Sequence, residues 1–170
     1  SATDFFSTLT RPSLLTASYS SVYQTEGLKS ASSRTLSTPA ARWDAYSHAL
    51  LEKGIVSRFA VYSRDKFREW TATRDFRLEP SEIQAIISGF DDDIKLRLHG
   101  IKIQNEAYTL TRMGMNRVMM VGRSSVDGSG CVIYLCRTCV LVALHHDGPQ
   151  TSLCFNTIEN IGDYLVQHGF

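Results

Sequence analysis

The chain has 170 residues, of which 43% are hydrophobic and 21% are charged, with 18 basic and 17 acidic side chains. This length fits one domain that can bury a core without metals or disulfides. The near-neutral charge argues against a strongly electropositive nucleic-acid surface, and no apolar run approaches the roughly 20 residues that a membrane span needs.

Residues 1–41 differ in composition from the rest of the chain. Seventeen of them are Ser or Thr, few are charged, and their apolar residues show no sustained period. We expect a largely disordered extension ahead of a folded domain at 42–170. A Ser-rich start with few acidic residues is also compatible with an organelle transit peptide, and this alternative stays open.

Three helices are predicted by proline, glycine and apolar spacing. The first begins near Pro39 and stops at Gly54, and the second runs from Pro80 to Phe90. The third occupies 160–170, where apolar residues recur at the spacing of one helix face.

Seven short strands are expected between these helices, separated by turn signals. Because the links are short, consecutive strands must pair antiparallel. The triple aspartate at 91–93 is expected to be a solvated connection. The expected strands are 55–62, a strand through Trp70, 100–103, 107–112, 117–121, 131–136 and 139–145. The predicted fold class is α+β: a central antiparallel β-sheet with the N- and C-terminal helices packed on one face and a further helix on the other.

Four cysteines have the spacing of a plant-type iron–sulfur site, C-x4-C-x2-C with a distant fourth. However, Cys131, Cys136 and Cys139 lie in predicted strands, whereas a cluster needs an exposed loop. We therefore expect buried free thiols and a reducing, cytosolic compartment. A thiol or cluster site on these three cysteines is the alternative.

No catalytic or metal-binding pattern is found. His145 and His146 are adjacent on a predicted strand, so their side chains point to opposite faces and cannot share one ion. Nothing resembles a nucleophile elbow, a phosphate loop or a metalloprotease helix. We expect no cofactor, no metal and no enzymatic activity.

Short segments that resemble the profilin family occur in the family's order across residues 42–170. They are Arg42–Tyr46 (W-x-x-Y), Glu69–Ala72 (W-A), Leu78–Phe90 (L-x-P-x-E-I…F), His99–Arg112 (G-I…Y-x-x-x-R) and the ending Gly162–Phe170. The resemblance implies a protein of the cytoplasm and cytoskeleton, expected to be monomeric. It would bind monomeric actin on one face and proline-rich segments on another.

The resemblance places a polyproline-binding groove on aromatic and apolar residues from both ends of the domain. Its predicted members are Trp43, Tyr46, Trp70, Tyr164, Leu165 and Phe170. A polyproline II helix is already stiff, so it loses little entropy on docking, and rings with polar tips suit its prolines and carbonyls. The alternative is that Trp43 and Trp70 are core aromatics beneath the terminal helices. Since the extension enters just before Trp43, its last residues are also hypothesised to compete with proline-rich ligands.

The actin-binding face implied by the resemblance centres on Arg112. Its predicted members are Leu98, Thr109, Leu110, Arg112, Arg123, Gln150, Phe155 and Asn156. Ala107, Leu135 and Asn156 stand where many profilins have lysine, so association should be slower and weaker. A proline-rich-peptide adaptor with weak or lost actin binding is therefore the alternative function. Phosphoinositide headgroups are a further expected ligand, through Arg112, Arg117, Arg123 and Arg137.

Overall fold

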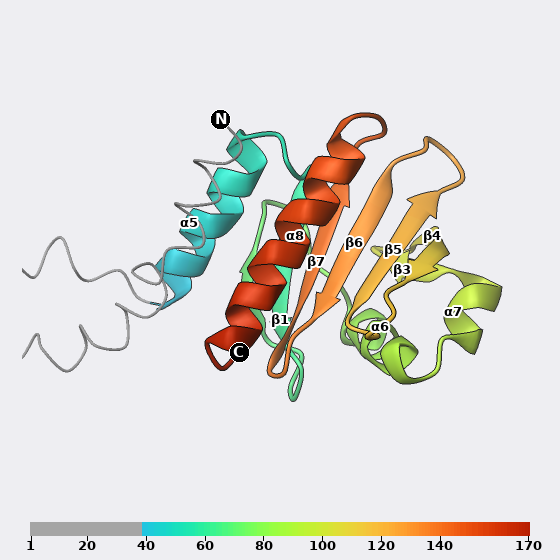
Figure 1. Ribbon diagram of the computed structural model, residues 1–170, viewed down its shortest axis with the longest axis horizontal. Coiled ribbons are helices and arrows are strands. Elements are labelled where there is room, and N and C mark those ends of the chain that lie inside the picture. Colours follow the sequence, from blue (N-terminus) through green and yellow to red (C-terminus); the bar gives the residue numbers. More distant parts are fainter. Residues whose placement is uncertain (1–38) are drawn as a thin grey trace, which may run out of the picture.

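Seven strands form one antiparallel sheet in the order β2-β1-β7-β6-β5-β4-β3 (Figure 1). The computed structural model describes residues 39–170, so the predictions made for residues 1–38 of the extension fall outside the described residues. Residues 39–41, assigned to the extension by their composition, belong to the first helix. The strands are β1 (Arg58–Ser63), β2 (Glu69–Ala72), β3 (Ile101–Ile103), β4 (Glu106–Met113), β5 (Met119–Ser124), β6 (Gly130–Leu135) and β7 (Cys139–His145).

Helices cover both faces of this sheet. The first helix α5 (Pro39–Glu52) and the last helix α8 (Gln150–Gln167) lie side by side on one face, and they share a core with β1, β6 and β7 (Figure 1). Helices α6 (Pro80–Asp91) and α7 (Ile94–His99) close a second core on the other face. The predicted α+β fold class, with the terminal helices together on one face, is confirmed.

The ends of the helices follow from local chemistry. Pro80 occupies the first turn of α6, where its missing N–H leaves no hydrogen bond unmade. Glu79 and Glu82 form a capping box there, and the Glu82 carboxylate also accepts the Asn105 amide at 2.9 Å. Gly54 has φ +68°, a conformation that glycine adopts without strain, and it ends α5 as predicted.

The structure differs from the sequence prediction at the starts of two strands. Strand β1 begins at Arg58 rather than at residue 55, because the Ile55 and Val56 amides bond the Leu50 carbonyl at the end of α5. Strand β5 begins at Met119 rather than at residue 117. Arg117 has φ +55° in the preceding turn, and its guanidinium donates to the Phe90 carbonyl at 2.7 Å.

Helix α7 was not predicted. It follows the aspartate-rich segment, and Asp93 accepts a 2.6 Å hydrogen bond from Arg97 one turn later. Leu96 is its one buried residue, so six residues with a single core contact leave no helical periodicity to detect in the sequence.

Helix α8 approaches the sheet closely at Gly162. A Cβ built on Gly162 would lie 2.4 Å from ring carbons of Tyr134 on β6, far inside van der Waals contact. The Tyr134 hydroxyl passes beside the helix and donates to Asp163 at 2.6 Å. The absence of a side chain at Gly162 therefore lets the helix lie flat on the Tyr134 ring.

We predict that Gly162→Ala destabilises the fold, although alanine is the better helix former by about 1 kcal/mol. The new methyl group must displace the inner part of the Tyr134 ring, an overpacking cost of about 1–3 kcal/mol. Denaturant unfolding should show a net loss of stability. Asn160→Ala, at an exposed position of the same helix, is the control and should change stability by less than about 0.5 kcal/mol. Equal stability of the two variants would contradict this account of the contact.

Candidate functional site

Aromatic rings from both ends of the domain meet at one corner of the structure. Trp43 of α5 lies 5.6 Å from Trp70 of β2, between ring centroids, and 6.0 Å from Phe170. The Phe170 ring is also 6.2 Å from Trp70, edge-on to both indoles. Tyr46 adds a fourth ring 6.2 Å from Trp43. These separations are those of favourable aromatic pairs, and we call the four residues the aromatic cluster.

The members of the aromatic cluster differ in exposure. Trp43 and Tyr46 are only 7% and 6% exposed, whereas Trp70 and Phe170 are half-buried. The expectation that all the rings line an open slot is therefore wrong for the two residues of α5. They share the helix face of Leu50, which packs on the sheet, so the periodicity that aligns them also buries them. Trp43 is thus a core aromatic, as the alternative interpretation expects, whereas Trp70 stays half-buried beside it.

Two further residues of the predicted groove lie beside the aromatic cluster. Tyr164 is half-buried, its ring stacks on His168 at 4.0 Å, and with Tyr46 it lines a small apolar pocket between α5 and α8. Leu165 is fully buried beneath them, so it supports the rings and presents no surface of its own.

Burial keeps the phenols of this corner in their neutral form. Desolvation raises the pKa of Tyr46, and the nearby Tyr164 raises it further. Desolvation also raises the pKa of Tyr164. Each hydroxyl therefore keeps its proton at physiological pH and remains able to donate a hydrogen bond, for example to a carbonyl oxygen.

A polar network links helix α5 to strand β2 and so sets the distance between Trp43 and Trp70. The Thr71 hydroxyl donates to Asp44 at 2.6 Å, and the Ser47 hydroxyl lies 2.9 Å from the same Thr71 oxygen. Since the Thr71 hydroxyl donates its one hydrogen bond to Asp44, the Ser47 hydroxyl is the donor of the second bond. Sequence reasoning missed this network, because Thr71 lies more than 20 positions from both Asp44 and Ser47 and so gives no local signal.

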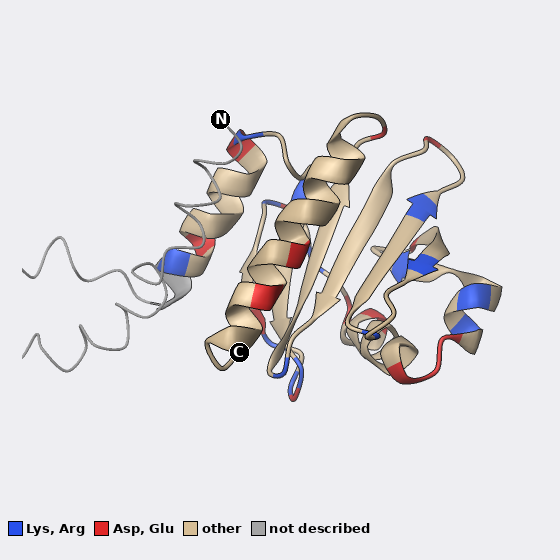
Figure 2. Cartoon of the chain, in the orientation of Figure 1, with Lys and Arg blue, Asp and Glu red and all other residues tan. Residues whose placement is uncertain are grey.

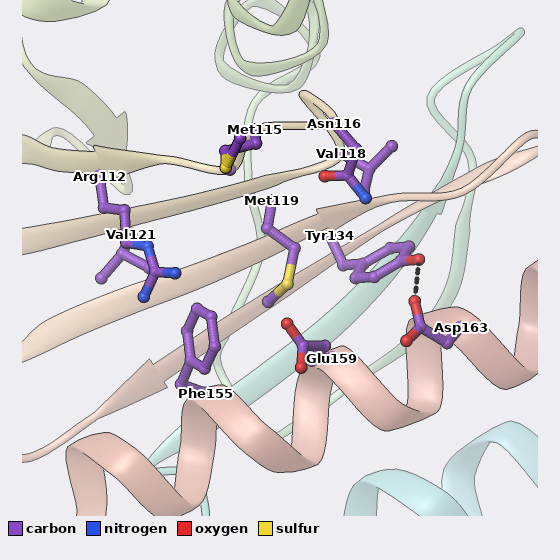
Figure 3. A pocket seen from close by; sticks show the side chains of 11 residues that line it. Arg112, Met115, Asn116, Val118, Met119, Val121, Tyr134, Phe155, Glu159 and Asp163 are labelled. Atoms are coloured by element: carbon purple, nitrogen blue, oxygen red, sulfur yellow. Dashed lines mark hydrogen bonds between the residues drawn. The ribbon is translucent and has the colours of Figure 1, made fainter.

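A second candidate surface lies between α8 and the strands β4 and β5. The Arg112 guanidinium sits over the Phe155 ring, 5.0 Å from its centroid, within the range of a cation–π contact. Beside this pair is an open pocket of about 360 Å³. Figure 3 shows Met119 and Tyr134 on the sheet side and the carboxylates Glu159 and Asp163 on the helix side.

A bulge in β4 brings Arg112 to this surface. Leu110 pairs with Gly122 and Arg112 pairs with Val121, so β4 advances by two residues while β5 advances by one. Without the bulge, Arg112 would point to the same face as Leu110, into the core under α6. The extra residue reverses the alternation and turns Arg112 toward α8. No turn residue marks this position in the sequence, so the bulge was not predicted.

The other residues predicted for the actin-binding face differ in their exposure to solvent. Thr109 and Arg123 lie opposite each other on β4 and β5, and both are exposed. Leu98 on α7 is 73% exposed. Leu110, in contrast, is buried in the core beneath α6, so its assignment to a binding surface is wrong. The remaining residues, Gln150, Phe155 and Asn156, lie in the first two turns of α8.

The four arginines predicted to bind phosphoinositides do not form one patch. Arg117 lies 3.8 Å from Asp93, and Arg123 lies 3.2 Å from Asp147. Arg137, in the turn after β6, and Arg123, opposite the start of β6, lie toward opposite ends of a strand about 20 Å long. Figure 2 shows the basic segments spread over several elements, with acidic ones between them.

The cysteines are free and buried, as the sequence predicts. Burial raises the pKa of Cys131 and of Cys154 to about 12. A hydrogen bond with Cys139, and then burial, raise the pKa of Cys136, so the reactive thiolate forms poorly at all three cysteines. Within residues 39–170, no group of three or more His, Cys, Asp or Glu side chains could hold a metal ion. His145 is buried and His146 is exposed, in line with their opposite directions on β7. In that same part of the chain, no helix is long and apolar enough to cross a membrane.

Comparison with known proteins gives consistent matches. A family model described as Profilin matches residues 41–170. The chain is 31% identical over 126 residues to the profilin of Saccharomyces cerevisiae, covering 73% of this chain and 95% of that one. It is 32% identical over 132 residues to the profilin of Schizosaccharomyces pombe, covering 75% and 98%.

Solved structures share the fold. Acanthamoeba castellanii profilin IB matches with a TM-score of 0.67 and 22% identity, over 75% of this chain and 99% of that chain. Mouse profilin IIa, solved in complex with a double repeat from the FH1 domain of mDia1, matches with a TM-score of 0.65 and 17% identity over the same shares.

We predict that Thr71→Val loosens the contact between α5 and β2. The change removes the donor to Asp44 and leaves the buried Ser47 hydroxyl without its acceptor, which should cost about 1–3 kcal/mol of stability. Thr71→Ser keeps the hydroxyl and should lose less. Denaturant unfolding with near-ultraviolet circular dichroism of the tryptophans measures both effects. Equal losses in the two variants would show that the network is not what holds these elements together.

Proposed function

Because this chain belongs to the profilin family, we propose that it binds monomeric actin on one surface and proline-rich segments on another, and so regulates actin polymerisation. Profilins are non-enzymatic actin-binding proteins. We further propose that the protein acts in the cytoplasm, with the cytoskeleton. The two surfaces proposed are the aromatic cluster with Tyr164, and the region around Arg112 and Phe155.

The observation that carries the proposal is the meeting of Trp43, Trp70 and Phe170 from three distant parts of the sequence. The exposed parts of Trp70 and Phe170, with Tyr164 beside them, offer flat apolar surface from side chains that include an indole N–H and a phenol O–H. A polyproline II segment has apolar rings and unpaired carbonyls, so it fits both features. Rings already held in place by neighbours lose little entropy on binding.

The actin side is proposed at the surface that combines Arg112 and Phe155 with exposed Thr109 and Arg123. The Phe155 ring and the guanidinium form a preorganised pair with apolar and charged character, a combination enriched in protein interfaces. Arg123 is partly neutralised by Asp147, and lysines are absent at Ala107 and Leu135. We therefore propose slower association and lower affinity than a lysine-rich surface would give.

The proposed surfaces are well separated. In the strand order, β2 with Trp70 and β4 with Arg112 have four strands between them. Five spacings of about 4.8 Å correspond to roughly 24 Å across the sheet. This distance supports binding of both partners at once, which delivery of actin to a proline-rich protein requires. The alternative function is a proline-rich-peptide adaptor that has lost actin binding. Phosphoinositide binding stays a prediction centred on Arg112. Among the described residues, the Arg112 guanidinium has no acidic side chain within 4 Å.

We predict that Phe170→Ala and Arg112→Glu affect different ligands. Loss of the Phe170 ring should weaken binding of a poly-L-proline peptide about tenfold and leave actin binding unchanged. Charge reversal at Arg112 should weaken actin binding at least about tenfold and leave poly-L-proline binding unchanged. Tryptophan fluorescence emission measures binding of the peptide, and the polymerisation rate of labelled actin measures binding of actin.

Each variant serves as the other's control. If the unaltered protein binds the peptide but does not slow actin polymerisation, the adaptor function replaces the one proposed. If either variant lost both activities with its fold intact, the assignment of two separate surfaces would be wrong.

A further inference from the structure

The Phe170 ring is held in the aromatic cluster by a turn that lies elsewhere in the sequence. Phe170 follows the end of α8, and its amide bonds back to the Leu165 carbonyl at 2.9 Å. Its carbonyl oxygen accepts two hydrogen bonds from Thr138, one from the amide at 2.5 Å and one from the hydroxyl at 2.7 Å. Thr138 lies in the turn that joins β6 to β7, so this turn fixes the position of Phe170.

The same turn is fixed in its place by Arg64, from the turn that joins β1 to β2. The Arg64 amide donates to the Thr138 carbonyl at 2.9 Å, and the Arg64 guanidinium donates to the Cys136 carbonyl at 2.9 Å. In Figure 1 the two turns and the end of the chain lie together at the foot of the sheet. The hairpin that carries Arg64 also carries Trp70 on its second strand.

Two rings of the aromatic cluster therefore depend on one set of hydrogen bonds. Trp70 belongs to the β1–β2 hairpin, and Phe170 is bound to the β6–β7 turn, which Arg64 joins to that hairpin. We propose that Thr138 and Arg64 are positioning residues that set the affinity of the aromatic cluster for proline-rich segments. This inference rests on the function proposed above.

The hydroxyl of Thr138 is exposed at the tip of its turn and donates out of its own hairpin, to Phe170. Its loss leaves the hairpin ladder intact but removes one of the two bonds to the Phe170 carbonyl. The Phe170 segment then samples more positions, and a ligand must order the ring on binding. One lost hydrogen bond of ordinary strength corresponds to about fivefold weaker binding.

The test compares three threonine variants of the full chain in titrations with a poly-L-proline peptide. Thr138→Val keeps the shape of the side chain and removes the hydroxyl, whereas Thr138→Ser keeps it. Thr111→Val is the matched control, because it removes a comparable hydroxyl bond, 3.1 Å to the Val121 carbonyl, on β4. Both tryptophans of the chain belong to the aromatic cluster, so intrinsic emission reports this site directly.

We expect Thr138→Val to raise the Kd for the peptide about fivefold, with Thr138→Ser and Thr111→Val close to the unaltered protein. In the two Thr138 variants, actin binding and the thermal midpoint should not change. If the unaltered protein binds the peptide and Thr138→Val binds it equally well, the positioning role is wrong while the proposed function stands. If the unaltered protein does not bind, the proposed function itself fails, and this inference with it.

Arg64→Ala provides an independent second variant and keeps the test decisive if Thr138→Val does not fold. It should also weaken peptide binding, because the turn that holds Phe170 loses the guanidinium bond to the Cys136 carbonyl and keeps only the backbone bond from the residue 64 amide. In the double variant the two losses should not add, since both act through one turn. Additive losses, or a parallel loss of actin binding, would show general damage and overturn the proposal.

Discussion

The close contact between Gly162 and the Tyr134 ring determines how α8 lies on the sheet, and both proposed surfaces depend on that helix. Helix α8 has 18 residues, so at 1.5 Å per residue it is a rod about 27 Å long. Phe155 near its start and Phe170 beyond its end are thereby kept far apart. Since α8 rests on β6 at Gly162, between these two rings, a change in its tilt would move both of them, and a side chain at Gly162 would force such a change.

Different interactions position the side chains of the two proposed surfaces. At the aromatic cluster, rings from α5, β2 and the end of the chain pack on one another, with hydrogen bonds from Thr71 and Thr138 at their edges. At the second surface, a β-bulge turns Arg112 toward Phe155. Each surface is built mainly from contacts between elements distant in the sequence, so each is rigid only when the whole domain is folded. This explains how one folded domain can present both of the proposed surfaces in a preorganised form.

Much of this architecture could be predicted, because its signals are local. Pro80 marks the start of α6 because its φ is fixed near the helical value, and Gly54 marks the end of α5 because glycine adopts a positive φ without strain. Consecutive short strands joined by short links require an antiparallel sheet. The aromatic residues of the cluster were identified from their resemblance to profilin segments. Burial of Trp43 was considered only as an alternative and burial of Tyr46 was not foreseen, although both follow from the face that these residues share with Leu50. The bulge at Arg112, the α5–β2 network and the bonds from Thr138 to Phe170 are set by tertiary contacts and have no local signature. Helix α7 was not predicted because its single buried leucine, Leu96, gives no helical periodicity in the sequence.

The most direct test of the central claim is a nuclear magnetic resonance titration of the isotope-labelled full chain with a poly-L-proline peptide. The two indole N–H signals, from Trp43 and Trp70, are unique reporters of the aromatic cluster. The account predicts shifts in the Trp70 indole signal and in the amides around Phe170 and Tyr164, with the amides of Arg112 and Phe155 unmoved. Unchanged indole signals at saturating peptide, or shifts centred on Arg112 and Phe155, would contradict it.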